Sequence, residues 1–183
     1  MKSLNHFTAA AALALAGLSA QAATQIVNVA GAASTNLLGE TGNTVLLVDI
    51  GANAVLDSLD WMVSLSAFSP SSLSEMQVSF GSSSGLDQLT FSPAAADTFS
   101  GTGSYSGTLS LAGLGVAAGA DGLLRIEFSE AYKDFAVGVA EGQWVSGSLT
   151  LNVSAVPEPA SAALALLGLT LVGGALGRSR REA

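Results

Sequence analysis

Apolar residues recur at every second position through the middle of this 183-residue chain, and this spacing limits its fold more than any other feature. Leu59, Trp61 and Val63 alternate with Asp60 and Met62, and the apolar residues of 124–129 alternate with polar residues. Successive side chains of a strand point to opposite faces, so this alternation predicts strands with one buried face. Residues 24–153 contain no long run at helical spacing, which predicts an all-β middle.

The predicted strands are short and are separated by turn residues. In the last of them, Val145, Gly147 and Leu149 are expected to face inward. The Ala/Gly stretch at 112–120 is interpreted as a loop. Strands at this spacing predict a single β-sandwich, specifically of jelly-roll type. They are expected at residues 25–29, 44–50, 59–67, 76–80, 88–91, 105–111, 124–129, 135–139 and 145–153.

The composition excludes several kinds of site. The chain has 0 cysteines, so it can form neither disulfides nor cysteine metal sites. Between residues 23 and 156 the only basic residues are Arg125 and Lys133, and the net charge of the whole chain is -8. A strongly acidic surface repels phosphate backbones, so no nucleic-acid partner is expected.

The N-terminal segment has the pattern of a signal peptide. Lys2 precedes an apolar run at residues 7–18, and Ala20 and Ala22 form an A-x-A cleavage site. Cleavage is therefore predicted before Ala23, and residues 1–22 are interpreted as a signal peptide. An uncleaved anchor helix is the alternative.

The C-terminal segment has three parts in a fixed order. Pro157, Glu158 and Pro159 come first, and the two prolines keep this tripeptide extended and accessible. An apolar run and an arginine cluster follow. The run includes Ala160, Leu164, Leu166, Leu167, Leu169, Leu171, Val172 and Leu176, and the cluster is Arg178, Arg180 and Arg181.

The apolar run is long enough for one short transmembrane helix. Residues 160–176 would extend about 26 Å as a helix, against about 30 Å of hydrocarbon. The arginines would stay on the cytoplasmic side and leave the preceding domain outside. The chain is thus divided into a signal peptide, an extracytoplasmic β domain at 23–155 and an anchor segment at 156–181.

This three-part tail resembles the PEP-CTERM sorting signal. The resemblance implies processing by an exosortase, a membrane enzyme of bacteria that make extracellular polysaccharide. The expected partners are then the exosortase and the inner membrane during sorting, and the expected destination is the cell surface or a biofilm matrix. A plain single-span anchor is the alternative interpretation of the tail.

The densest carboxylate group is a candidate calcium site. Asp121, Glu127, Glu130 and Asp134 lie on or near one predicted strand, and calcium prefers oxygen ligands. Their spacing matches no EF-hand loop, so a solvated charged face is the other interpretation. Apart from this calcium, no cofactor is expected.

A hydrolase motif at residues 81–85 lacks its partners. Gly81, Ser83 and Gly85 satisfy G-x-S-x-G, yet the single histidine, His6, lies in the predicted signal peptide. No catalytic residue is therefore assigned, and the chain is not expected to be an enzyme. A small hydrolase remains only as a remote alternative.

Two functions remain. The first is a non-enzymatic exported protein of the cell surface or extracellular matrix. The second is a calcium-assisted carbohydrate-binding module that uses residues 121–134 together with Trp144 or Tyr132. Trp61 and Trp144 are expected to be core residues rather than ligand platforms.

Overall fold

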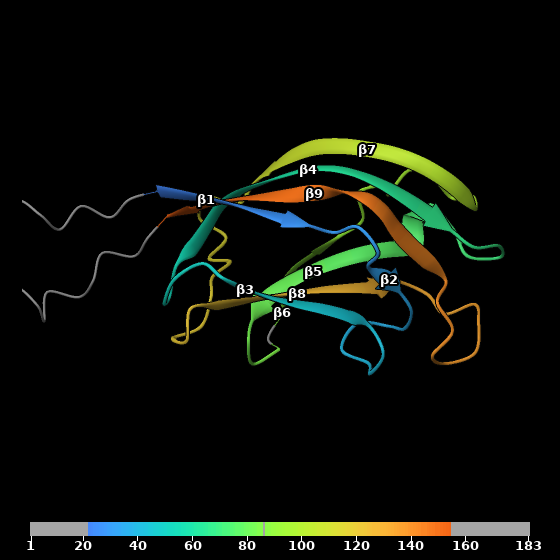
Figure 1. The fold of residues 1–183 in the computed structure, drawn as a ribbon, viewed down its shortest axis with the longest axis horizontal. Helices are drawn as coiled ribbons and strands as arrows, with labels where there is room; N and C mark the ends of the chain where they lie inside the picture. Colours follow the sequence, from blue (N-terminus) through green and yellow to red (C-terminus); the bar gives the residue numbers. More distant parts are fainter. Residues whose placement is uncertain (1–21, 86, 155–183) are drawn as a thin grey trace, which may run out of the picture. The chain divides into compact units, whose positions relative to one another are not determined.

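The computed structural model describes residues 22–85 and 87–154, which form two antiparallel sheets packed as a sandwich (Figure 1). The all-β expectation is confirmed. The described elements, in chain order, are β1 (Ala22–Asn28), β2 (Ala33–Ser34), β3 (Thr44–Asp49), β4 (Val55–Ala67), the 3-10 helix η1 (Leu73–Glu75), β5 (Met76–Ser82), β6 (Asp87–Phe91), β7 (Gly101–Ser110), β8 (Leu123–Glu130) and β9 (Gly142–Ser154).

Each sheet is assembled from strands that are distant in the sequence. Sheet A has the order β1-β9-β4-β7, with β2 also paired to β9, and sheet B has the order β3-β8-β5-β6. After β2, the chain changes sheet at each connection between successive strands except that from β5 to β6. Most strand neighbours are therefore long-range contacts, and the two layers lie one above the other in Figure 1.

The core lies between the two sheets. Leu59 and Leu65 of β4 and Phe80 of β5 are fully buried there. Phe128 of β8 meets Trp144 of β9 edge-on, with ring centroids 4.9 Å apart, so this pair joins sheet B to sheet A. Such an aromatic pair stabilises a core by about 1 kcal/mol beyond the area it buries. The expected core position of Trp144 is thus confirmed.

The alternation predicted for β4 holds, whereas β8 is buried on both faces, because Glu127 and Ser129 on its outer face are fully buried as well. In β4, Leu59, Val63 and Leu65 are buried, while Met62 between them is 71% exposed. Trp61 faces the core at its margin, tilted against Phe91 with ring centroids 5.0 Å apart.

The predicted alternation of β9 is wrong at its beginning. A register shift opposite Ser64 and Leu65 places Val145 outside the regular pairing, so Trp144 turns inward and Val145 is exposed. Gly147 makes this β-bulge feasible, because its φ is +113° and an added Cβ would lie 2.1 Å from the carbonyl oxygen of Met62. Because of this one extra residue, every residue of β9 that precedes the bulge lies on the opposite face of the sheet from the predicted one.

The strand predicted at residues 135–139 is also wrong, because this segment is a loop. Val139 N–H bonds to the Ala136 carbonyl oxygen within the loop at 3.1 Å, and two other backbone N–H groups bond to side chains. Phe135 donates to Oε1 of Glu141 at 2.9 Å, and Gly138 donates to Oδ1 of Asn36 at 3.0 Å. A strand was not predicted at β2, nor a helix at η1, whereas the loop expected at residues 112–120 is present.

Candidate functional site

The predicted targeting segments lie outside the described residues, except for Ala22. This holds for Ala20, for the sorting tripeptide and for the apolar run and arginines that follow it. Ala22 is the first residue of β1 and pairs with Ser154, the last residue of β9. In the described part of the chain, no helix has the length and hydropathy of a membrane span.

The four calcium candidates do not form one site. Within residues 22–85 and 87–154, no group of three or more His, Cys, Asp or Glu side chains is placed to hold a metal ion. Asp121 lies in the turn before β8, where Oδ2 accepts from Ser83 Oγ at 2.5 Å and Oδ1 accepts from Leu123 N–H at 3.1 Å. These bonds lower the pKa of Asp121. Calcium binding stays a prediction.

Glu127 has a structural environment on the outer face of sheet B. The side chain is fully buried, and its Oε1 accepts hydrogen bonds from Gly39 N–H at 2.9 Å and from Asn43 Nδ2 at 2.6 Å. Its Oε2 forms an ion pair with Arg125. The carboxylate therefore holds the loop before β3 against the sheet.

Glu130 and Asp134 meet two acids that the sequence did not single out. We call Glu75, Glu130, Asp134, Glu141 and the one cation among them, Lys133, the acidic end of the sandwich. Lys133 Nζ pairs with Glu141 Oε1 at 2.7 Å, and Glu141 also accepts from Asp134 N–H at 3.0 Å. Although burial opposes it, Lys133 and these N–H groups lower the pKa of Glu141.

Glu130 is the unusual member of the acidic end. It is 1% exposed, and neither carboxylate oxygen has a hydrogen-bond partner. Ser34 lies nearby, but its hydroxyl donates its one hydrogen to the carbonyl oxygen of Ser129 at 2.6 Å. Burial raises the pKa of Glu130 to about 7, and the charges of Glu141 and Glu75 add to this effect. Burial and the same two acids raise the pKa of Asp134.

The serine motif lies at the end of a strand and leads into another strand. Gly81 and Ser82 end β5, a turn follows, and the next described element is β6. Ser83 donates to Asp121, as given above, and the Oγ atoms of Ser82 and Ser84 lie 2.6 Å apart. A nucleophile elbow joins a strand to a helix, so this turn has a different geometry.

The outer face of sheet A carries an array of small polar side chains, which we call the hydroxyl face. Most members bear a hydroxyl, Asp60 is the only charged member, and Ile26 and Met62 are its apolar members. It consists of the outward residues Thr24, Ile26 and Asn28 of β1, Ser58, Asp60, Met62, Ser64 and Ser66 of β4, Thr102, Ser104, Ser106, Thr108 and Ser110 of β7, and Ser146, Ser148, Thr150 and Asn152 of β9.

Side-chain hydrogen bonds connect this face from strand to strand. Thr108 Oγ1 donates to Asp60 Oδ1 at 2.5 Å, and Asn152 Nδ2 donates to Asp60 Oδ2 at 3.0 Å. Asn152 also bonds Ser58 at 2.9 Å and accepts from Thr24 at 3.1 Å. The bonded network thus runs from β1 across β9 and β4 to β7, and it fixes these side chains before any ligand arrives.

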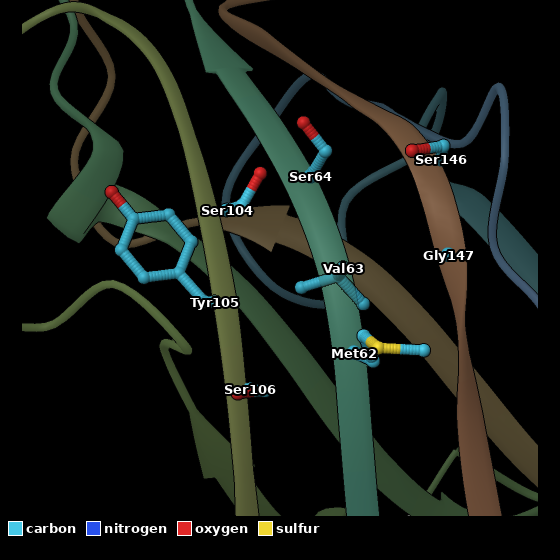
Figure 2. A pocket seen from close by; sticks show the side chains of 8 residues that line it. All are labelled: Met62, Val63, Ser64, Ser104, Tyr105, Ser106, Ser146 and Gly147. Atoms are coloured by element: carbon cyan, nitrogen blue, oxygen red, sulfur yellow. The ribbon is translucent and has the colours of Figure 1, made fainter.

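A shallow hollow of about 430 Å³ lies on the hydroxyl face. Figure 2 shows Met62 on β4 between two strands that carry small residues, namely Ser104 and Ser106 on β7 and Ser146 on β9. Gly147 also lines the hollow, so the β-bulge contributes to its shape. Its volume lies within the usual range for small-ligand sites.

The sequence contained the signal for this face, but it was interpreted only as the solvent side of each strand. Apart from Met62, the outward positions of β4 and β9 are polar in the alternation from which the strands were predicted. Their common feature, a hydroxyl without a charge, becomes visible only when the strand order brings four strands together. Trp144 is fully buried and is therefore not accessible for stacking on a sugar, whereas Tyr132 is 63% exposed.

Residues 155–181 match the PEP-CTERM protein-sorting motif. This motif implies an exported protein of the cell envelope that is sorted by an exosortase. The predicted resemblance of the tail is therefore confirmed. No curated protein matches the chain.

Several solved structures share partial similarity with the sandwich. The serine protease of Aeromonas sobria in complex with its chaperone has 17% identity and a TM-score of 0.42, covering 79% of this chain and 30% of that one. The VP2 subviral particle of infectious bursal disease virus has 13% identity and a TM-score of 0.31, covering 76% and 34%. A Bacillus endospore appendage has 12% identity and a TM-score of 0.33, covering 75% and 92%. These scores are too low to carry an argument about function.

Proposed function

Because the chain carries a PEP-CTERM protein-sorting motif, we propose that it is a non-enzymatic protein of the cell surface or extracellular matrix. The motif at residues 155–181 is the observation that carries this proposal. The β domain would be the part of the protein that functions at the surface, and the tail would be the signal that directs its sorting. An anchor helix at residues 160–176 and a signal peptide at residues 1–22 belong to the same proposal.

The topology supports a domain of jelly-roll type. The strand orders β1-β9-β4-β7 and β3-β8-β5-β6 place four main strands in each sheet, and the chain winds between the sheets as it proceeds. Eight strands in two sheets are the usual content of a jelly roll. The short β2 only extends the pairing of β9.

The test of sorting is fractionation of the native host. The full chain and its Pro157→Ala, Pro159→Ala variant would be expressed at equal levels, and cell, membrane and medium fractions compared. We expect the unaltered chain at the surface or in the matrix and the variant retained in the membrane fraction. Retention of the unaltered chain in the cytoplasm would refute the proposal.

A second function, carbohydrate binding, is favoured by the hydroxyl face. Each hydroxyl both donates and accepts hydrogen bonds, so the face is complementary to a polyhydroxylated ligand of low charge. Small serine side chains lose little rotamer entropy on binding. Met62, 71% exposed, provides an apolar contact for the C–H groups of a sugar ring. This site would not require the calcium candidates.

Binding would be measured by calorimetry with the polysaccharide of the host, with and without calcium. The informative variant is Ser104→Glu, which places a charge in the hollow, and the matched control is Ser84→Glu in the exposed turn after β5 of sheet B. We expect Ser104→Glu to weaken binding at least tenfold and the control to bind normally. Equal binding by both variants would exclude the hydroxyl face, and a strict calcium requirement would favour the loop around residues 121–134.

A further inference from the structure

The edge of sheet A at β7 is open. β7 is the last strand in the order of this sheet, and within the described ranges no strand pairs with its outer side. Its 10 residues pair with β4 in an unbroken register from Ser58 opposite Ser110 to Ala67 opposite Gly101. The strand is thus long and regular enough in its pairing to serve as a template for another strand.

The pairing with β4 determines which backbone groups of β7 point outward. Leu111 N–H donates to the Asp57 carbonyl oxygen at 2.8 Å, just beyond the end of the strand. Hydrogen-bonded and non-hydrogen-bonded positions alternate along an antiparallel pair, so the odd-numbered residues of β7 bond to β4. The N–H and C=O groups of the even-numbered residues therefore point away from the sheet, and these residues are all exposed.

The β7 edge lacks the usual protection against pairing. Proteins shield open edges with charged residues, prolines, bulges or short strands, and β7 has no charge, no proline and no irregularity in its register. The other edges differ. β6 has 5 residues and a register shift at Gly81, β3 has 6 residues and ends at Asp49, and β1 has 7 residues.

We infer that β7 pairs antiparallel with β7 of a second copy of this chain. A two-fold axis makes such a contact self-complementary, because each strand offers the same outward donors and acceptors to the other. The absence of charge on β7 removes the repulsion that a charged edge would meet in its own copy. The inference goes beyond the proposed function and does not depend on it.

Side-chain size favours a register with Ser106 on the two-fold axis. In that register Tyr105 lies opposite Gly107 of the second copy, and Gly103 lies opposite Leu109. Each large inward side chain then faces a glycine instead of another large residue, and the rings of Trp61 and Tyr105 lie over Gly107 and Gly103 of their own chain. If the register moved by one residue toward the N-terminus of β7, two Tyr105 side chains would face each other at a position where Cα atoms are only about 4.5 Å apart. The paired sheets would also join two hydroxyl faces into one surface.

Single cysteines provide a direct test, because the chain has 0 cysteines of its own. Full-length Ser106→Cys and Thr24→Cys variants would be expressed in the host, treated with a mild oxidant and run on a non-reducing gel. Hydrogen-bonded positions in antiparallel strands lie about 5.5 Å apart, within disulfide range. We expect a covalent dimer from Ser106→Cys. Thr24→Cys, on the exposed edge strand β1, is the control for random collision.

Two further variants fix the direction of pairing. Thr102→Cys and Ser110→Cys should each dimerise poorly alone but cross-link efficiently when coexpressed, because antiparallel strands place residue 102 opposite residue 110. Self-linking of Thr102→Cys would indicate parallel pairing and overturn the inference. Equal dimer yields from Ser106→Cys and Thr24→Cys would overturn it too.

Discussion

The outer faces of the two sheets differ in burial and in charge. On sheet B, Glu127 is fully buried, paired with Arg125 and enclosed by a loop, whereas on sheet A the hydroxyl face is open and carries Asp60 as its only charge. A buried charge stabilises the fold only while its partners are present. An exposed hydroxyl array contributes little to stability and is therefore available for binding. The outer face of sheet B is therefore structural, whereas that of sheet A is the candidate binding face.

The largest effect is expected at the bulge that shapes the hydroxyl face. In Gly147→Ala, the added Cβ would lie 2.1 Å from the Met62 carbonyl oxygen at a φ of +113°. We expect destabilisation by about 3 kcal/mol or more, measured by urea unfolding. Gly101→Ala is the control, because Gly101 has a φ of +127° but no atom within 4 Å of the added Cβ. Equal losses would mean that backbone strain alone, not the close approach, requires glycine.

The same chemical change on the two faces should then differ in size. Glu127→Gln removes the ion pair with Arg125 and should destabilise the protein by about 3 kcal/mol, because the guanidinium loses its partner. Asp60→Asn alters a half-exposed carboxylate and should cost less than about 1 kcal/mol. Both values come from chemical denaturation at neutral pH. If the two losses were similar, the distinction between the faces would fail.

A pH-dependent effect is expected at the acidic end. The pKa of Glu130 is about 7 against an ordinary value of 4.5, so between these values the folded carboxyl keeps a proton that the unfolded chain has released. The folded state then binds more protons, and stability falls as pH rises, by at most about 3 kcal/mol. The lowered pKa of Glu141 acts in the opposite sense, because its contribution is lost on acidification.

Glu130→Gln isolates this contribution. The variant has no proton to lose, so its stability should change less than that of the unaltered protein between pH 4.5 and pH 8. Urea midpoints across this range are the measurement, and Glu40→Gln, at an exposed position, is the control. Parallel pH profiles for Glu130→Gln and the unaltered protein would show that Glu130 does not cause the loss of stability at higher pH.

The smallest stability effect is expected within the hydroxyl network. Thr108→Val removes one exposed hydrogen bond to Asp60 and should change the unfolding free energy by less than about 0.5 kcal/mol. Thermal unfolding would detect a larger change. A loss above about 1.5 kcal/mol would show that the hydroxyl face is part of the structural framework rather than a surface available for a ligand.

The strands were predictable where alternation was uninterrupted, as in β4 and β8. The prediction failed where a β-bulge reversed the alternation or where side-chain hydrogen bonds replaced strand pairing. Gly147 allows a bulge that exchanges the environments of Trp144 and Val145, and Glu141 draws the backbone of residues 134–135 out of any ladder. Both depend on contacts from distant residues, so no local periodicity reveals them.

The candidate site was less predictable than the fold. The sorting motif is contiguous, and its residues could be read directly from the sequence. The hydroxyl face is formed by residues of four strands. Which of these residues are neighbours depends on the strand order and register, which the sequence alone does not give. Glu127 and Glu130, which are close in the sequence, do not share a site, because they lie on opposite sides of β8. The acidic end also includes Glu75, which lies in η1, far from Glu130 in the sequence.

Intact-mass spectrometry of the mature protein from its native host decides whether the tail is a processed sorting signal or a permanent anchor. We expect a species that has lost the signal peptide before Ala23 and the tail beyond Pro159, and we expect the Pro157→Ala, Pro159→Ala variant to retain its tail. A mature species that keeps Arg178 to Ala183 would contradict this expectation, and the tail would then be a plain membrane anchor.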